Sequence, residues 1–386
     1  MTDKKELSVE IGGREIKAVW SDLAEQASGS VTLSSGNTIV LATAVMSKGK
    51  REGIDFFPLT VDYEEKFYAI GAILGSRFMK REGRPSDEAV LSGRVVDRTI
   101  RPLFDQRIRN EAQVVLTILS VGEYDPDTLA VNAASLALAT SNIPWRGPIS
   151  AVRIIENKDT GEFIVNPTFK EREENEKTLE LLSCGEGDSI SMVEVASREA
   201  KEEKVKEAFR KALPEIEKLQ NFQKEAAKKF GKEKSSVEIS ETPAIMKEKF
   251  AQIIKPELHG AIFTGEAGKE ALEVLSDKWT SIVKEELPEE KPDLGLLLFE
   301  EETNAELHRG AIEEGKRADG RAMDELRPLK AEVGVISPIV HGSGLFYRGG
   351  THVLSVLTLG GPEDSQIIDG MEIQTKKRFM HHYNFP

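Results

Sequence analysis

The stretch Phe67–Arg109 reads FYAIGAILGSRFMKREGRPSDEAVLSGRVVDRTIRPLFDQRIR. It joins a Gly-rich approach to a short basic and aromatic tip, and then to the start of a helix. From residue 77 onward it holds nine Lys or Arg against five Asp or Glu, whereas the whole chain has a net charge of −14. The stretch is therefore a local basic patch on an acidic protein, and the remaining elements are organised around it.

The tip of this patch combines one aromatic ring with several cations, at residues Arg77, Phe78, Met79, Lys80 and Arg81. Single-stranded RNA binds to flat side chains that stack on its bases and to cations that contact its phosphates. The pattern therefore favours an RNA contact. A solvated loop with a buried Phe78 explains the same residues equally well, because basic loop tips are common.

A helix is expected to begin at Ser86, a good N-cap residue followed by two acidic residues, and to stop near the next proline. Within it, Arg94, Arg98 and Arg101 recur at spacings of four and three, so they lie on one face. Asp97 is placed to pair with Arg94 or Arg101. This favours ion pairs and packing over a binding role for the three arginines.

The composition indicates a multidomain protein from a reducing compartment. A chain of 386 residues exceeds one ordinary domain, and 39% hydrophobic residues suffice for packed cores. The single cysteine, Cys184, excludes an internal disulfide. We find no signal-peptide pattern and no apolar run of membrane-spanning length, so a cytoplasmic location without membrane contact is expected. The negative net charge argues against broad, non-specific binding to nucleic acid.

Two kinds of pattern divide the chain into three regions. Residues 1–196 mix strand-like and helical segments, which predicts an α+β domain. In it, Val114–Val121 is typical of a strand buried on both faces, and Thr128–Ser141 of a small-residue helix packed on a sheet. Residues 197–299 are charged and helix-periodic, which predicts an all-helical domain. Residues 300–386 begin with a helix and then return to strand-like segments.

The last region repeats part of the first. Gly342–Leu354 matches Gly29–Leu41 at an offset of 313 residues, with six identical positions. Upstream, Gly13-Arg14 matches Gly320-Arg321 at a slightly different offset. This pattern predicts duplication of a whole domain. The second copy stops at Pro386, well short of the length of the first, so unpaired strands and open apolar faces are expected there, and the chain is expected to be a fragment of a longer protein.

Several long motifs, in this order, resemble those of bacterial polynucleotide phosphorylase. They are FFPLTVDYEEKFYAIGAILGSRFMKREGRPSDEAVLSGRVVDRTIRPLF at 56–104, EEGKRADGR at 313–321, and HGSGLFYRGGTHVLSVLTLG at 341–360 with HHYNFP at 381–386. The resemblance covers the whole chain. It implies an α+β fold with duplicated ribonuclease PH-like (ribosomal S5 domain 2-like) cores: a first core at 1–196, an all-helical linker at 197–299, and an incomplete second core at 300–386.

The resemblance also implies an activity. The family degrades single-stranded RNA, including mRNA, from its 3′ end with inorganic phosphate as co-substrate, releasing nucleoside diphosphates, and it polymerises them in reverse. It implies a homotrimeric ring with a central channel, Mg²⁺ as cofactor, and a place in an RNA-degradation assembly. The family's catalytic carboxylate pair, which holds Mg²⁺, and its Lys and Ser groups lie later in the second core. These catalytic and metal-binding positions are therefore expected beyond Pro386, and this chain alone is expected to be inactive.

The family's channel-constricting loop is Phe-Phe-Arg-Arg, which corresponds here to Phe78, Met79, Lys80 and Arg81. The resemblance implies that these residues grip RNA, with Arg84 as an extension of the same surface. Methionine lacks the base stacking of an aromatic ring, which is worth about 1–3 kcal/mol per base. Lysine keeps the charge of arginine but not its bidentate geometry.

In the second core, Arg348 matches an arginine of the family's Arg-Gly-Glu-Thr-Gln motif, near the active site. The sequence here is Arg-Gly-Gly-Thr-His, and an arginine at a strand end beside a turn is the alternative. Three carboxylates at Asp62, Glu64 and Glu65 imitate a metal site, although a solvated strand end explains them better.

Three functional hypotheses remain at this point. The first is a phosphorolytic exoribonuclease, a polyribonucleotide nucleotidyltransferase in its full-length form. The second is a non-catalytic ring scaffold that grips RNA, in the manner of exosome subunits with the same fold. The third is a protein that shares only the fold. A carboxylate pair with a lysine in the downstream sequence separates the first from the second, and RNA binding by the basic loop tests the third.

Overall fold

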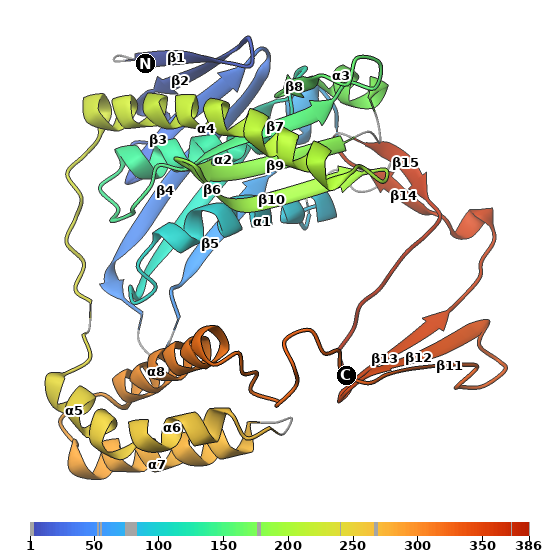
Figure 1. Ribbon diagram of the computed structural model, residues 1–386. Helices are drawn as coiled ribbons and strands as arrows, with labels where there is room; N and C mark the ends of the chain where they lie inside the picture. The colour runs from blue at the N-terminus through green and yellow to red at the C-terminus, as the bar shows by residue number, and fades with distance from the viewer. Residues whose placement is uncertain are drawn as a thin grey trace. The chain divides into compact units, whose positions relative to one another are not determined.

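The computed structural model describes residues 4–51, 54, 56–73, 83–175, 179–239, 241–265, 269–371 and 373–385. It divides into two compact units (Figure 1). The first comprises Met1–Ile239 and Ile367–Thr375, and the second comprises Ser240–Gln366 and Lys376–Pro386. Among the described helices, none combines the length and the apolar composition needed to cross a membrane.

The first unit contains a six-stranded sheet in the order β1-β2-β3-β4-β6-β5. Neighbouring strands are antiparallel except for β5 and β6, which are parallel. Tight turns with alternating apolar residues explain the hairpins at the start of the chain. The strands are β1 (Lys5–Ile11), β2 (Arg14–Trp20), β3 (Gly29–Ser35), β4 (Thr38–Lys50), β5 (Leu59–Glu64) and β6 (Asn110–Ser120).

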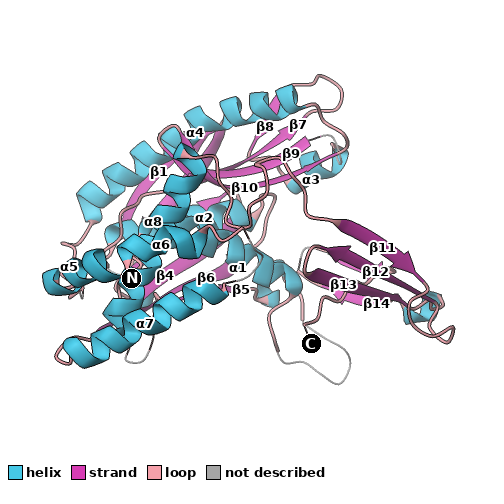
Figure 2. Ribbon diagram, turned by 60° about the horizontal axis from the view of Figure 1, so that its bottom comes forward, coloured by secondary structure: helices cyan, strands magenta, loops and turns pink. Residues whose placement is uncertain are grey.

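A second sheet of this unit has the order β10-β9-β7-β8 and is antiparallel throughout (Figure 2). Its strands are β7 (Ser150–Glu156), β8 (Phe163–Val165), β9 (Leu179–Glu186) and β10 (Ser189–Ser197). Four α-helices accompany the two sheets: α1 (Asp87–Ile100), α2 (Pro126–Thr140), α3 (Phe169–Glu174) and α4 (Glu202–Phe230). Short 3₁₀ turns lie at η1 (Asp22–Ala24), η2 (Phe67–Ile70) and η3 (Arg101–Leu103).

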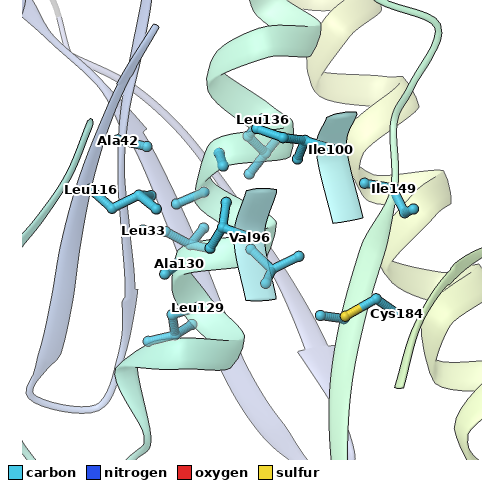
Figure 3. Packing of buried hydrophobic residues seen from close by; sticks show 14 of the residues in the cluster. Leu33, Ala42, Val96, Ile100, Leu116, Leu129, Ala130, Leu136, Ile149 and Cys184 are labelled. Carbon is cyan, nitrogen blue, oxygen red and sulfur yellow. The ribbon is translucent and has the colours of Figure 1, made fainter. Parts of the chain in front are cut away.

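Helix α2 is the centre of the first core. Every residue of it except Asp127 is buried, which confirms the prediction of a small-residue helix packed on a sheet. Figure 3 shows Leu129 and Leu136 of this helix among the side chains of the surrounding elements. Helix α2 can lie close to β3 because β3 starts with a glycine. A Cβ atom on Gly29 would lie 2.2 Å from the carbonyl oxygen of Ala137.

Strand β6 is buried on one face rather than two. Val114, Leu116 and Ile118 are fully buried, whereas Val115 and Thr117 between them are partly exposed. The prediction of a strand buried on both faces was therefore wrong. The apolar run in the sequence overstates the burial because the β-branched residues of the second face pack only partly.

Helix α4 belongs to the first unit, although the composition changes near residue 196. Its apolar stripe, including Ala212, Ile216 and Leu219, is buried in the same hydrophobic cluster as the sheets. Its charged residues face outward. The compact unit therefore continues to residue 239, beyond the boundary expected at residue 196, because a solvated helix face dominated the sequence pattern.

The second unit contains a helical part with its own hydrophobic cluster. Trp279 is fully buried there, packs edge-on against Phe250 with ring centroids 5.1 Å apart, and donates from Nε1 to the carbonyl oxygen of Gly295 at 2.8 Å. The last helix runs through the boundary expected at residue 300. The helices are α5 (Ala244–Ile253), α6 (Lys255–Ile262), α7 (Glu270–Glu286) and α8 (Pro292–Glu313).

The strands after α8 repeat the hairpin of the first sheet in the same register. Strands β12 (Gly342–Arg348) and β13 (Thr351–Leu357) pair from Gly342↔Leu357 to Arg348↔Thr351. Strands β3 and β4 pair from Gly29↔Ala44 to Ser35↔Thr38. Each position is shifted by 313 residues, so the duplication read from the sequence is confirmed at the level of strand pairing. The remaining elements are β11 (Leu329–Val333), η4 (Pro362–Asp364), β14 (Gln366–Asp369) and β15 (Gln374–Lys377).

The same offset extends upstream through β11. Lys330 pairs with Tyr347, as Lys17 pairs with Ser34 in the first copy. At this offset the counterpart of Arg14 is residue 327. The match of Gly13-Arg14 to Gly320-Arg321 has a different offset, so the strand pairing does not test it and it stays a prediction.

The two copies differ in the burial of their apolar residues. Val40 and Ala44 of β4 are fully buried beneath α2, whereas Val353 and Leu357 of β13 are 41% and 49% exposed. The open apolar face expected for the second copy is therefore observed among the described residues.

Candidate nucleic-acid interface

A chain of hydrogen bonds through Ser86 joins the two segments that flank the predicted loop of the basic patch. The Oγ atom of Ser86 accepts from the backbone N–H of Ala89 at 2.9 Å, which confirms the predicted N-cap of α1. The same hydroxyl donates to the Glu65 carboxylate at 2.6 Å. Burial raises the pKa of Glu65, the bond from Ser86 opposes the increase, and the charge of Glu88 adds to it. Residues on both sides of the predicted loop are thus held together.

The predicted RNA-gripping residues Phe78, Met79, Lys80 and Arg81 lie outside the described residues. Arg84 is described and exposed, and it makes no hydrogen bond or ion pair with another described residue. It therefore presents its charge to solvent next to the start of α1.

The three arginines of α1 have different surroundings. Arg101 pairs with Asp97, with Nη2 2.6 Å from Oδ1, and also donates to backbone carbonyls of residues 57 and 59. The interpretation as an ion pair is confirmed for this residue. For Arg94 and Arg98 it was wrong, because both are exposed and unpaired within the described part of the chain. The single carboxylate of Asp97 forms an ion pair with only one of the three arginines.

The exposed face of α1 also carries apolar side chains. Leu91 is 63% exposed and Val90 is 50% exposed, while the opposite face is buried against β5. Leu91, Arg94 and Arg98 follow one another at spacings of three and four and form a stripe. A guanidinium without a carboxylate partner keeps five donors in a fork that matches phosphate. This stripe, which we call the α1 stripe, was missed by the reasoning from sequence.

A buried ion network lies at the N-terminus of α2. Arg153 of β7 contacts Asp125 at 2.6 Å and Glu180 at 2.5 Å, and Arg172 of α3 contacts the same two carboxylates at 3.0 and 2.8 Å. Asp127 lies 3.8 Å from Arg153. The network joins the N-terminus of α2 to α3 and the second sheet. No local sequence pattern signals it, because its members come from four separate elements.

Two groups near this network have shifted pKa values. Partial burial and the neighbouring Asp125 raise the pKa of Asp127 to about 6, against the opposing charge of Arg153. Burial likewise raises the pKa of Cys184 to about 11, which disfavours the thiolate and makes this cysteine a poor nucleophile.

The shift of Asp127 predicts a pH dependence. Its pKa is about 6 in the folded state and about 3.9 in an unfolded chain, so the folded protein loses stability as the pH rises through this window. We expect Asp127→Asn to gain about 1–2 kcal/mol relative to wild type between pH 4.5 and 7.5. Urea unfolding at several pH values measures this difference. A variant whose stability stays parallel to that of wild type over this range would contradict the assignment.

The other residues singled out from sequence are dispersed. Arg348 is exposed at the end of β12, before a turn whose two glycines have positive φ angles of 35° and 79°. The carboxylates at 62, 64 and 65 have separate partners, in Gln113, Lys66 and Ser86. Within the described ranges, no three His, Cys, Asp or Glu side chains are grouped so that they could hold a metal ion.

Comparison with known proteins gives a domain match and several similar proteins. Residues 12–144 match the model of the 3′ exoribonuclease family, domain 1. The polyribonucleotide nucleotidyltransferase of Bacillus mycoides is 41% identical over 392 residues, which cover 100% of this chain and 53% of that protein. That of Syntrophomonas wolfei is 42% identical over 386 residues, covering 99% and 54%.

Among solved structures, rice Rrp46 matches with a TM-score of 0.44 and 16% identity, over 58% of this chain and 94% of that chain. This likeness is too distant to carry an argument about function. The chain spans about half the length of the curated relatives it matches. Residues 12–144 thus match the 3′ exoribonuclease family, domain 1, and the chain is similar along its whole length to about half the length of these bacterial polyribonucleotide nucleotidyltransferases.

Proposed function

We propose that this chain is the RNA-binding part of a phosphorolytic 3′-to-5′ exoribonuclease. The observation that carries the proposal is the similarity of the entire chain, at about 41% identity, to polyribonucleotide nucleotidyltransferases. In the proposed reaction, an oxygen of inorganic phosphate attacks the phosphorus of the last phosphodiester. The bond from phosphorus to the O3′ atom breaks, a nucleoside diphosphate is released, and the shortened RNA keeps a 3′-hydroxyl. The reverse reaction extends RNA.

In this proposal, the residues of this chain bind the strand and do not perform the chemistry. Phe78, Met79, Lys80 and Arg81 grip it, with Arg84 beside them. Arg94 and Arg98 of the α1 stripe offer further phosphate contacts, because no described carboxylate neutralises them. Arg348 approaches the reaction centre from the second core.

The remaining parts of the proposal follow the family. We propose a homotrimer whose channel is lined by three copies of the basic patch, a cytoplasmic location, and a place in an RNA-degradation assembly. Mg²⁺ is the proposed cofactor, yet the described carboxylates do not converge on a site that fits it. We therefore assign no metal-dependent step to residues of this chain.

The first test replaces the loop residues. We expect the triple variant Phe78→Ala, Lys80→Ala, Arg81→Ala to bind poly(A) at least tenfold more weakly, because one stacking ring and two phosphate contacts are lost. The slope of log affinity against log salt should shrink by about 1.4, at about 0.7 per phosphate contact on a single strand. Fluorescence anisotropy at several salt concentrations measures both. Equal and salt-insensitive affinities would remove the RNA-loop proposal.

The second test concerns the α1 stripe. Arg94→Gln with Arg98→Gln should weaken poly(A) binding about tenfold and reduce the salt slope by a similar amount. Arg198→Gln is a matched control, since Arg198 is an exposed arginine outside the basic patch. An effect of the control as large as that of the double variant would indicate non-specific charge loss instead of a binding surface.

The chain by itself should bind RNA without degrading it. We expect the purified 386-residue protein to release no nucleoside diphosphate from poly(A) in the presence of phosphate and Mg²⁺. Release of nucleoside diphosphate by this chain would contradict the proposal that its residues bind RNA and do not perform the chemistry. Binding without release by a longer gene product would favour the alternative, a non-catalytic RNA-gripping ring scaffold.

A further inference from the structure

A cavity of about 910 Å³ lies in the first unit, between η3 and the segment that follows α4. Its floor includes the rings of Phe104 and Trp145, both buried in the core. The indole Nε1 of Trp145 donates to the carbonyl oxygen of Ile100 at 3.0 Å, which holds the ring in place. The volume is in the range of sites that bind small molecules. We call it the strap cavity, after the segment that forms one wall.

The strap is residues 232–239, which follow α4 and belong to no helix or strand. Its backbone is tied to the end of α2: the N–H of Lys232 donates to Thr140 at 3.1 Å, and that of Ser235 donates to Asn142 at 2.8 Å. Val237 and Ile239 of the strap add apolar wall. Backbone hydrogen bonds and apolar contacts of the first unit therefore hold this wall of the cavity in place.

Two cations of the wall form no ion pair with a described residue, although the charge of Arg146 helps to lower the pKa of Asp105. Arg146 donates to the carbonyl oxygens of Pro102 and Leu103 at 3.1 and 3.5 Å, and it has no carboxylate within ion-pair distance among the described residues. At least two of its five N–H donors remain for a ligand. The single acidic lining residue, Asp105, is paired with Arg107 at 2.7 Å.

Lys234 is the second such cation. Its ammonium donates to carbonyl oxygens at the end of α2, with distances of 2.8 Å to residue 138, 3.2 Å to residue 139 and 2.8 Å to residue 141. Burial lowers the pKa of Lys234 to about 8. The carbonyl groups carry no net charge, so the positive charge of Lys234 is not neutralised. The resulting positive potential beside the apolar walls favours binding of an anion.

We propose that the strap cavity binds a small aromatic phosphate, the chemistry of a nucleoside monophosphate. The phosphate meets the free donors of Arg146 within the field of Lys234, and the planar ring lies on the apolar floor beside Trp145. Arginine is suited to phosphate because its fork gives two parallel hydrogen bonds. This site is separate from the RNA-binding residues proposed above and does not depend on that function.

The test titrates the 386-residue chain with AMP and follows the fluorescence of its tryptophans, of which Trp145 lines the cavity. We expect saturable quenching that is lost in Trp145→Phe, while calorimetry still detects AMP binding to that variant. Adenosine lacks the phosphate, and ribose 5-phosphate lacks the ring. Each should bind at least tenfold more weakly than AMP.

Arg146→Gln should weaken AMP binding at least tenfold, whereas Arg198→Gln, with an exposed arginine outside the cavity, should leave it unchanged. Circular dichroism confirms that both variants are folded. Undiminished AMP binding by Arg146→Gln, equal losses in both variants, or no binding of AMP by wild type would overturn the proposal.

The same aromatic phosphate also occurs at the end of an RNA. Competition by a 5′-phosphorylated oligoadenylate, but not by its unphosphorylated form, would assign the cavity to an RNA end. No competition by either would assign it to a free nucleotide. Both results support an aromatic phosphate as the ligand.

Discussion

Replacing Arg153 by Met is expected to lower the free energy of unfolding of the first unit by about 3–5 kcal/mol. Arg153 is the centre of the buried ion network, with Asp125 at 2.6 Å and Glu180 at 2.5 Å. Without it, Arg172 alone faces the carboxylates, and at least one negative charge stays buried without compensation. Breaking one side of a buried pair costs more than the pair contributes, because the remaining charge has lost its water.

Urea denaturation, followed by hydrogen exchange of amides in β7 and β9, measures this loss. Arg198→Met is the matched control, since that arginine is exposed and lies outside the network; its effect should stay within about 0.5 kcal/mol. The prediction fails if Arg153→Met costs less than about 1 kcal/mol. In that case water or a local rearrangement compensates the carboxylates.

Replacing Trp279 by Ala should cost about 3–5 kcal/mol, and the loss should be confined to helices α5–α8. Trp279 is fully buried, and its removal takes away the edge contact with Phe250 and the hydrogen bond to Gly295. A cavity of that size cannot close in a small helical cluster. We propose on this basis that α5–α8 fold as a unit distinct from the first core.

Hydrogen exchange resolved by segment tests this proposal. Amides of α5–α8 should exchange faster in Trp279→Ala, while those of β4 and β6 keep wild-type rates. Trp279→Phe is the conservative control, because it keeps a ring against Phe250 and loses only the donor to Gly295. Equal acceleration in both units would show that they unfold together and would refute the proposed division.

Signals that depend on neighbours in sequence were read correctly. Ser86 was identified as an N-cap because its hydroxyl serves an amide only three residues away. The burial of α2 followed from its run of small apolar residues. The duplication at an offset of 313 was confirmed because hairpin register depends on turn length and alternation, which are local properties.

Predictions that depended on which face of a helix or strand is exposed to solvent were wrong. The charged residues of α4 suggested a new domain at residue 196, although the apolar stripe of the helix completes the first core. The strand β6 was predicted to be buried on two faces and is fully buried on one. In both cases, the composition gives the polarity of the residues, but burial depends on which other element packs against them.

The sequence by itself determined the resemblance to polyribonucleotide nucleotidyltransferases, the order of the elements and the internal repeat, since these rest on residue identity and short-range geometry. Only the tertiary structure decided which of three arginines on α1 is paired, which carboxylates meet Arg153, and how the strap forms one wall of an open cavity. Coulomb energy and desolvation depend on distances across the fold. Spacing along the chain does not contain those distances.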